Sequence, residues 1–176
     1  MLSGVAVESS ASLIPPYEIH GRPAFACVTF NLGESDKVVA DAASLLWMDS
    51  TTKISTWCHG GFCDCQFRQC SGENGCFNYY QGPGKVTLGF TEPGDMLPFA
   101  VTPEHGWILT NQAFVAGSPN VNVNCRFSGC LACSCSGEGA FLTKVTVNEG
   151  TGIFFAGGYG EVVVWLALFV VFLWCC

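Results

Sequence analysis

The cysteines form two clusters whose spacing is suited to metal or thiol chemistry. The chain has 12 cysteines in 176 residues, and most lie in the stretches CHGGFCDCQFRQC (58–70) and CRFSGCLACSC (125–135). Tetrahedral zinc takes four nitrogen or sulfur ligands, commonly delivered as two close pairs. Cys63 with Cys65, and Cys133 with Cys135, would each share one face of a strand. One pair from each cluster could therefore meet at a zinc ion.

Other spacings within the clusters favour different interpretations. Cys65 and Cys70, like Cys130 and Cys135, are five residues apart and would face opposite sides of a regular strand. Redox-active thiols and cysteines packed as small apolar side chains remain alternatives. We therefore predict no metal and no cofactor by default. Zinc is the alternative, and its candidate ligands are Cys63, Cys65, Cys133 and Cys135.

A four-residue phrase, CSGE, occurs twice, at Cys70 and at Cys135, and the two copies are 65 residues apart. An acid–base pair made from Glu73 and Glu138 is one explanation. The architectural explanation is a tight turn, in which Gly adopts a positive φ and the following Phe77 or Phe141 enters the core. The sequence contains no GxSxG, Walker or HExxH motif, and none of its three histidines lies near a plausible Ser or Asp partner in sequence. We expect the phrase to mark a fold, with no catalytic residues, in a protein that is not an enzyme.

The elements that would position these residues are short strands. Gly and Pro interrupt the chain every few residues, and the segments between them are rich in Val, Phe, Thr and Ile. This pattern predicts an all-β sandwich or barrel. One segment, 37–47, is also compatible with a helix, although its Val-Val pair favours a strand. The clearest predicted strands are 25–30, 86–90, 107–115, 121–127 and 152–156.

The order of landmarks suggests an internal duplication. The segment GPGKVTLGF (82–90) corresponds to GTGIFFAGG (150–158), and Leu32-Gly33-Glu34 corresponds to Pro93-Gly94-Asp95. We predict a β-sandwich built from two pseudo-symmetric repeats that share one interior. The predicted organisation is a flexible N-terminal segment, a sandwich domain with its two repeats, and an apolar tail: 1–16, 17–160 (repeats 17–90 and 91–160) and 161–176.

Composition and charge exclude several classes of function. Hydrophobic residues make up 49% of the chain and charged residues 12%, so a sizeable core is expected. The formal net charge is -7 and no two basic residues are adjacent, so no nucleic-acid partner is expected. The first 21 residues lack both the basic, apolar pattern of a secretory signal and the Arg-rich pattern of a mitochondrial transit peptide. This leaves the cytoplasm or a destination reached through an internal targeting signal, where thiols usually stay reduced.

The C-terminal segment is uniformly apolar. Residues 162–176 read VVVWLALFVVFLWCC, fifteen residues without a charge. A helix of that length extends only about 22 Å, whereas a bilayer core is about 30 Å thick. A buried strand is the simpler interpretation, and a short membrane anchor is the alternative. A membrane is therefore one candidate partner of this segment.

The ordered motifs resemble a known family. SGENGCFNYYQGPGKVTLGFTEPGDMLPFAV, followed by ILTNQAFVAGSPNVNV and SGEGAFLTKVTVNEGTGIFFAGGYG, is similar to the family of altered inheritance of mitochondria protein 24. The resemblance covers about residues 17–160. It implies a β-sandwich of the type called tryptophan RNA-binding attenuator protein-like, which is tied to oligomer formation. It also implies a setting in mitochondria and a link to inner-membrane organisation. Two features depart from the family pattern, namely the two cysteine clusters and the apolar ending.

Together these observations predict a non-catalytic, oligomeric scaffold or interaction protein that binds copies of itself or another protein. By resemblance it would be mitochondrial, and the cytoplasm is the alternative location. The alternative function is a cysteine-based metal-binding or thiol-responsive module. The family carries no established catalytic residue, and its fold name does not establish RNA or tryptophan binding here.

Overall fold

The structure of the chain is a computed structural model that describes residues 13–57, 76–110, 112–127, 141–167 and 170–175, with side chains described at these residues apart from 125–127, 141 and those beyond 162. These residues form fifteen β-strands and contain no helix. The predicted all-β class is therefore confirmed for this part of the chain. The segment 37–47, which could have been helical, contains strand β3 and most of strand β4.

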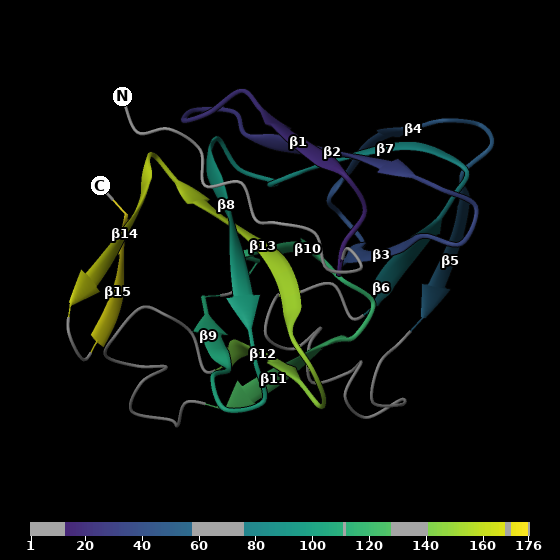
Figure 1. The fold of residues 1–176 in the computed structure, drawn as a ribbon. Coiled ribbons are helices and arrows are strands. Elements are labelled where there is room, and N and C mark those ends of the chain that lie inside the picture. Colours follow the sequence, from purple (N-terminus) through teal and green to yellow (C-terminus); the bar gives the residue numbers. More distant parts are fainter. Residues whose placement is uncertain (1–12, 58–75, 111, 128–140, 168–169, 176) are drawn as a thin grey trace.

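The strands form three larger antiparallel sheets and one hairpin (Figure 1). Sheet A has the order β1 (Tyr17–His20), β2 (Cys27–Leu32), β7 (Gly84–Gly89) and β4 (Leu45–Met48). Sheet B has the order β5 (Lys53–Trp57), β6 (Phe77–Gln81), β3 (Lys37–Asp41), β10 (Phe114–Gly117), β13 (Gly152–Tyr159) and β8 (Gly94–Val101). Sheet C has the order β11 (Val121–Phe127), β12 (Phe141–Val147) and β9 (Trp107–Leu109).

Sheet B is the middle layer, because its strands bury side chains on both faces. Side chains alternate between the two faces of a strand. On β3, Val38 and Ala40 belong to one core cluster and Val39 belongs to the other. On β13, Phe155 and Phe154 divide in the same way. Continuous apolar runs, such as the Val-Val and Phe-Phe pairs, are what a strand covered on both faces requires.

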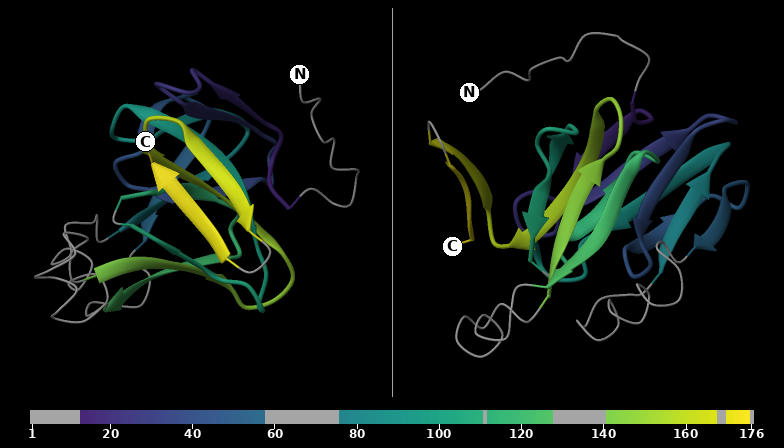
Figure 2. Two further views of the ribbon diagram at one scale, coloured as in Figure 1. Left: turned by 90° about the vertical axis from the view of Figure 1, so that its left-hand side faces the viewer. Right: turned by 90° about the horizontal axis from the view of Figure 1, so that it is seen from below.

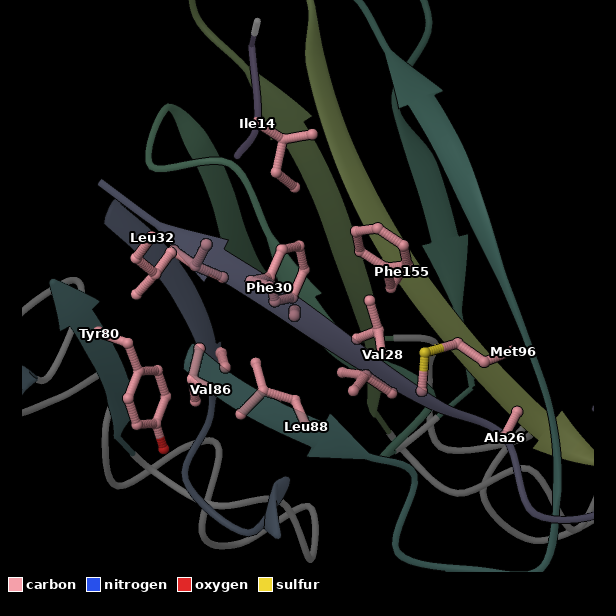
Figure 3. Close-up of a cluster of buried hydrophobic side chains, with 14 residues drawn as sticks. Ile14, Ala26, Val28, Phe30, Leu32, Tyr80, Val86, Leu88, Met96 and Phe155 are labelled. Atoms are coloured by element: carbon pink, nitrogen blue, oxygen red, sulfur yellow. The ribbon is translucent and has the colours of Figure 1, made fainter. Parts of the chain in front are cut away.

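The first core cluster fills the space between sheet A and sheet B (Figure 3). Phe30 of β2 and Phe155 of β13 meet edge to face with ring centroids 5.3 Å apart. Tyr17 of β1 meets Phe155 in the same manner at 4.9 Å. Such aromatic pairs add to the stabilisation that comes from burying the rings. This cluster holds the strands of the first half of the chain against β13 of the second half.

The second core cluster lies between sheet B and sheet C. Phe154 stacks on Phe99 of β8 with centroids 5.5 Å apart, and Val123 and Val145 of sheet C are buried beside it. Phe77, which follows the first CSGE phrase, is buried in this cluster and meets Phe114 edge to face at 5.8 Å. The side chain of Phe141 lies outside the described ones, so the two phenylalanines of the repeated phrase are not compared.

The two halves of the chain have the same pattern of strand pairing. In the first half, β7 pairs with β2 and β4, and β6 pairs with β3 and β5. In the second half, β13 pairs with β8 and β10, and β12 pairs with β9 and β11. Strands β2 to β7 thus correspond, in chain order, to strands β8 to β13. This correspondence supports the two-repeat interpretation of the sequence.

A matching irregularity strengthens the correspondence. The ladder between β4 and β7 shifts register between Leu45 and Trp47, which pair with neighbouring residues of β7. The ladder between β10 and β13 shifts in the same way between Phe114 and Ala116, each 69 positions further along the chain. A bulge at the same place in both halves is a specific feature of the backbone.

Two details of the predicted organisation are wrong. Leu32-Gly33-Glu34 does not correspond to Pro93-Gly94-Asp95, because the first turn follows β2 whereas the second begins just before β8. Glycine beside an acidic residue suits many tight turns, so the similarity is local. The predicted strand 107–115 is two strands, β9 and β10, because a turn with Gln112 at φ 65° separates them.

The two terminal segments contain residues that the structure describes. Within the predicted flexible segment 1–16, Ile14 is buried in the first core cluster and the Pro16 carbonyl accepts a hydrogen bond from the Asn31 amide. The apolar ending forms strands β14 (Val162–Ala167) and β15 (Val170–Cys175), which pair with each other in an antiparallel hairpin. The hairpin stands to one side of the three sheets (Figure 2). Its backbone is that of strands, in agreement with the simpler interpretation of the sequence, and association with a membrane stays a prediction.

Candidate functional site

The residues predicted to carry chemistry lie mostly outside the described part of the chain. This applies to the candidate zinc ligands and to the carboxylates of the CSGE phrases: Cys63, Cys65, Cys133, Cys135, Glu73 and Glu138. Within the described residues, no group of three or more His, Cys, Asp or Glu side chains is placed to hold a metal ion. Cys27 is a half-buried thiol that forms no disulfide, and Cys76 is half-buried as well.

The fold places the two cysteine-bearing segments at equivalent points. Segment 58–75 connects β5 to β6, and segment 128–140 connects β11 to β12. The strand pairs at their roots correspond, since Trp57 pairs with Phe77 and Phe127 pairs with Phe141. Both segments thus extend from the same end of corresponding hairpins. This position is a property of the duplicated topology.

A cleft of about 200 Å³ lies where the two halves meet. It is lined by the end of β3, the turn before β4, the end of β7 and the segment that leads into β10: Asp41, Ala43, Ser44, Gly89, Phe90, Thr91, Gln112, Phe114 and Val115. The Asp41 carboxylate accepts the Ala43 amide at 3.0 Å, and the Ser44 hydroxyl donates to the Asp41 carbonyl at 2.7 Å. These bonds hold the turn between β3 and β4. They therefore give the polar groups of the cleft a structural role.

A partly buried ion pair lies at another point where the halves meet. The Asp95 carboxylate is fully buried, and the Arg22 guanidinium donates to both of its oxygens at 2.7 and 2.8 Å. Asp95 also accepts the amide of Met96 at 2.8 Å and that of Val162 at 3.4 Å. Burial alone would raise the pKa of Asp95, but the hydrogen bonds from Arg22 and Met96 outweigh it and hold the pKa below its usual value. The pair links the turn after β1 to β8 and to the start of β14.

Large apolar side chains are exposed at several sheet edges. On β4, Leu46 and Trp47 are exposed, and on β9 Ile108 is exposed. The edge strand β5 exposes Ile54 and Trp57, and an open groove of about 280 Å³ lies beside Trp57. Exposed apolar groups that gather at sheet edges are typical of surfaces that bind other proteins. These residues cannot be identified from the sequence, because exposed and buried apolar strands have the same sequence pattern.

The sequence of residues 17–165 matches the family described as mitochondrial biogenesis AIM24. The chain belongs to the AIM24 family. The match confirms the family suggested by the motifs, and it covers strand β1 to most of β14. The family description links this chain to mitochondrial biogenesis.

A solved structure has a similar fold. The crystal structure of protein SPYM3_0169 from Streptococcus pyogenes matches with a TM-score of 0.63 and 19% sequence identity, over 85% of this chain and 67% of that one. At this identity the likeness shows the fold alone. No curated protein sequence matches the AIM24 chain. Within its described residues, no helix combines the length and apolar character needed to cross a membrane.

Proposed function

We propose that this AIM24 chain is a non-catalytic scaffold of mitochondrial biogenesis that acts by binding copies of itself or other proteins. The observation that supports this proposal is the exposure of large apolar side chains on sheet edges, above all Leu46, Trp47 and Ile108. Leaving such side chains in water is unfavourable by about 25 cal/mol per Å² of apolar surface, so a partner that covers them gains binding energy. The family match supports a mitochondrial setting. The finer proposal, a role in organising the inner membrane, rests on the resemblance of the sequence motifs.

The proposal is tested on the full-length chain. In cells that carry a tagged copy, we expect the protein to fractionate with mitochondria and to migrate in native gels as a particle larger than one chain. Light scattering on the purified chain then separates self-assembly from binding of another protein. A chain that is monomeric when pure and that captures no partner from mitochondria would contradict the scaffold function.

The alternative function, a cysteine-based metal or thiol module, is decided on the same sample. The observation in its favour is that both cysteine-bearing segments extend from the same end of corresponding hairpins. Elemental analysis of protein purified without chelator would show stoichiometric zinc if the alternative holds. Loss of that zinc in the Cys63→Ser and Cys133→Ser variants would assign the ligands. Zinc-free protein that still assembles would support the scaffold.

A further inference from the structure

The two halves of the chain are joined by a pair of strands, one from each half, and this junction is the model for a contact between two copies of the chain. Strand β3 of the first half pairs with β10 of the second, with Ala40 opposite Ala116 and Val39 opposite Gly117. This pairing merges three strands from each half into the single sheet B. The central residues of both strands are apolar, and each is at most 4% exposed: Val38, Val39, Ala40, Phe114, Val115 and Ala116.

Each half also contains an equivalent of the strand that the other half contributes to this junction. In the second half, β9 has the position of β3, because β9 pairs with β12 as β3 pairs with β6. In the first half, β4 has the position of β10, because β4 pairs with β7 as β10 pairs with β13 and shows the same bulge. Among the described strands, β4 is one of the two outer strands of sheet A and β9 is one of the two outer strands of sheet C.

The residues at these two edges are apolar like those of the internal junction, but three of their side chains are exposed, whereas Leu109 is buried in the second core cluster. The positions equivalent to the six buried residues are Leu45, Leu46, Trp47, Trp107, Ile108 and Leu109, and all six are apolar. Yet Leu46 is 58% exposed, Trp47 49% and Ile108 43%. Neither β4 nor β9 carries a charged residue, whereas the edge strands β1 and β5 carry Glu18 and Lys53. Charges on an edge strand protect it from pairing with another chain, and β4 and β9 lack this protection.

We propose that β4 of one copy pairs with β9 of a second copy, in the antiparallel arrangement that β3 and β10 adopt within the chain. This inference rests on the proposed scaffold function and names its interface. Transferring the internal register by 69 positions places Trp47 opposite Leu109 of the second copy and Met48 opposite Ile108. The two surfaces are different, so the contact is head to tail and each copy can bind one neighbour on either side.

The test uses three full-length variants that each place a lysine on an exposed apolar position of an edge strand. Trp47→Lys alters β4, Ile108→Lys alters β9, and Ile54→Lys alters β5, which has no role in the junction. Light scattering and sedimentation should show that the unaltered chain and Ile54→Lys assemble alike. Trp47→Lys and Ile108→Lys should each be monomeric, with association weakened about tenfold or more, because the lysine would be buried without a partner.

Mixing the two edge variants decides the arrangement. Ile108→Lys keeps an intact β4 and Trp47→Lys keeps an intact β9, so an equimolar mixture should form a particle of two chains and no larger one. Recovery of this particle also shows that both variants are folded. If the unaltered chain assembles and neither Trp47→Lys nor Ile108→Lys changes the mass of the particle, the proposed junction is wrong, but the scaffold function is not contradicted. The proposed junction would also be overturned if the two edge variants stay monomeric when mixed, or if the unaltered chain is itself monomeric. The scaffold function would be contradicted as well only if the chain also captured no other protein from mitochondria.

Discussion

At the scale of single residues, Arg22 and Asp95 show how one ion pair fixes distant segments. Arg22 follows β1 and Asp95 lies in β8, yet the guanidinium reaches both carboxylate oxygens. Gly94 beside it has no room for a side chain, because a Cβ there would collide with the Gly158 carbonyl. The Asp95 amide in turn donates to the Gly160 carbonyl at 2.9 Å. The Pro-Gly-Asp turn therefore serves to join β8, β13 and the start of β14.

Replacing Arg22 should destabilise the chain in a pH-dependent way. In Arg22→Leu the buried Asp95 carboxylate loses its charged partner, and we expect the free energy of unfolding to fall by about 1–3 kcal/mol at pH 7. This is less than for a fully buried pair, because Arg22 is itself 44% exposed. The low pKa of Asp95 contributes stability above the ordinary aspartate value of about 3.9, and this contribution disappears as the pH falls through the lower, folded pKa. The difference between the two proteins should therefore shrink below about pH 4. Urea unfolding at several pH values measures it, with the exposed Glu18→Gln as a control that changes little. A difference that does not depend on pH would contradict this account.

At the scale of elements, β13 is covered on both faces, as β3 is. Phe154 and Phe155 are adjacent and fully buried, one in each core cluster. We expect Phe154→Ala and Phe155→Ala each to cost about 3–5 kcal/mol, because each leaves a cavity in a different layer. In urea unfolding, the control Tyr159→Ala on the exposed end of β13 should cost much less. One strongly and one weakly destabilised phenylalanine variant would mean that β13 has only one buried face.

The sequence predicted the strands better than their partners. Val121–Phe127 was predicted as a strand and is β11, since alternating Val residues mark a half-buried strand. The 107–115 run was predicted as one strand because its apolar residues hide the turn at Gln112. The exposed Leu46, Trp47 and Ile108 could not be found, because an apolar strand becomes an edge only through long-range pairing. The cysteine candidates stay predictions, since they lie outside the described residues.

At the scale of the whole molecule, the two halves are similar units that share one sheet. Sheet B takes β5, β6 and β3 from the first half and β10, β13 and β8 from the second. The second core cluster likewise combines Val39 and Phe77 with Phe99 and Phe154. We infer that duplication supplied both the internal junction and, in β4 and β9, a second pair of edges with the same shape. Each copy of the CSGE phrase lies, in chain order, between corresponding strands, and the architectural explanation of the phrase stays a prediction because its residues lie outside the described ones.

Because the halves share a sheet and a core cluster, they should unfold as one cooperative unit. We expect Phe30→Ala, in the first half, to lower hydrogen-exchange protection by the same free energy at Val39 of β3 and at Val145 of β12, although Val145 belongs to the other half. Conversely, Val123→Ala in sheet C should lower protection at Val28 of β2. Phe30 lies in the first half and Val123 in the second, and both are buried in core clusters that contain residues of both halves. The physical reason is that the β3–β10 ladder cannot remain formed when either half loses its packing. Protection that falls only in the altered half would show two independent units, and the internal junction would then be too weak to serve as the template for assembly.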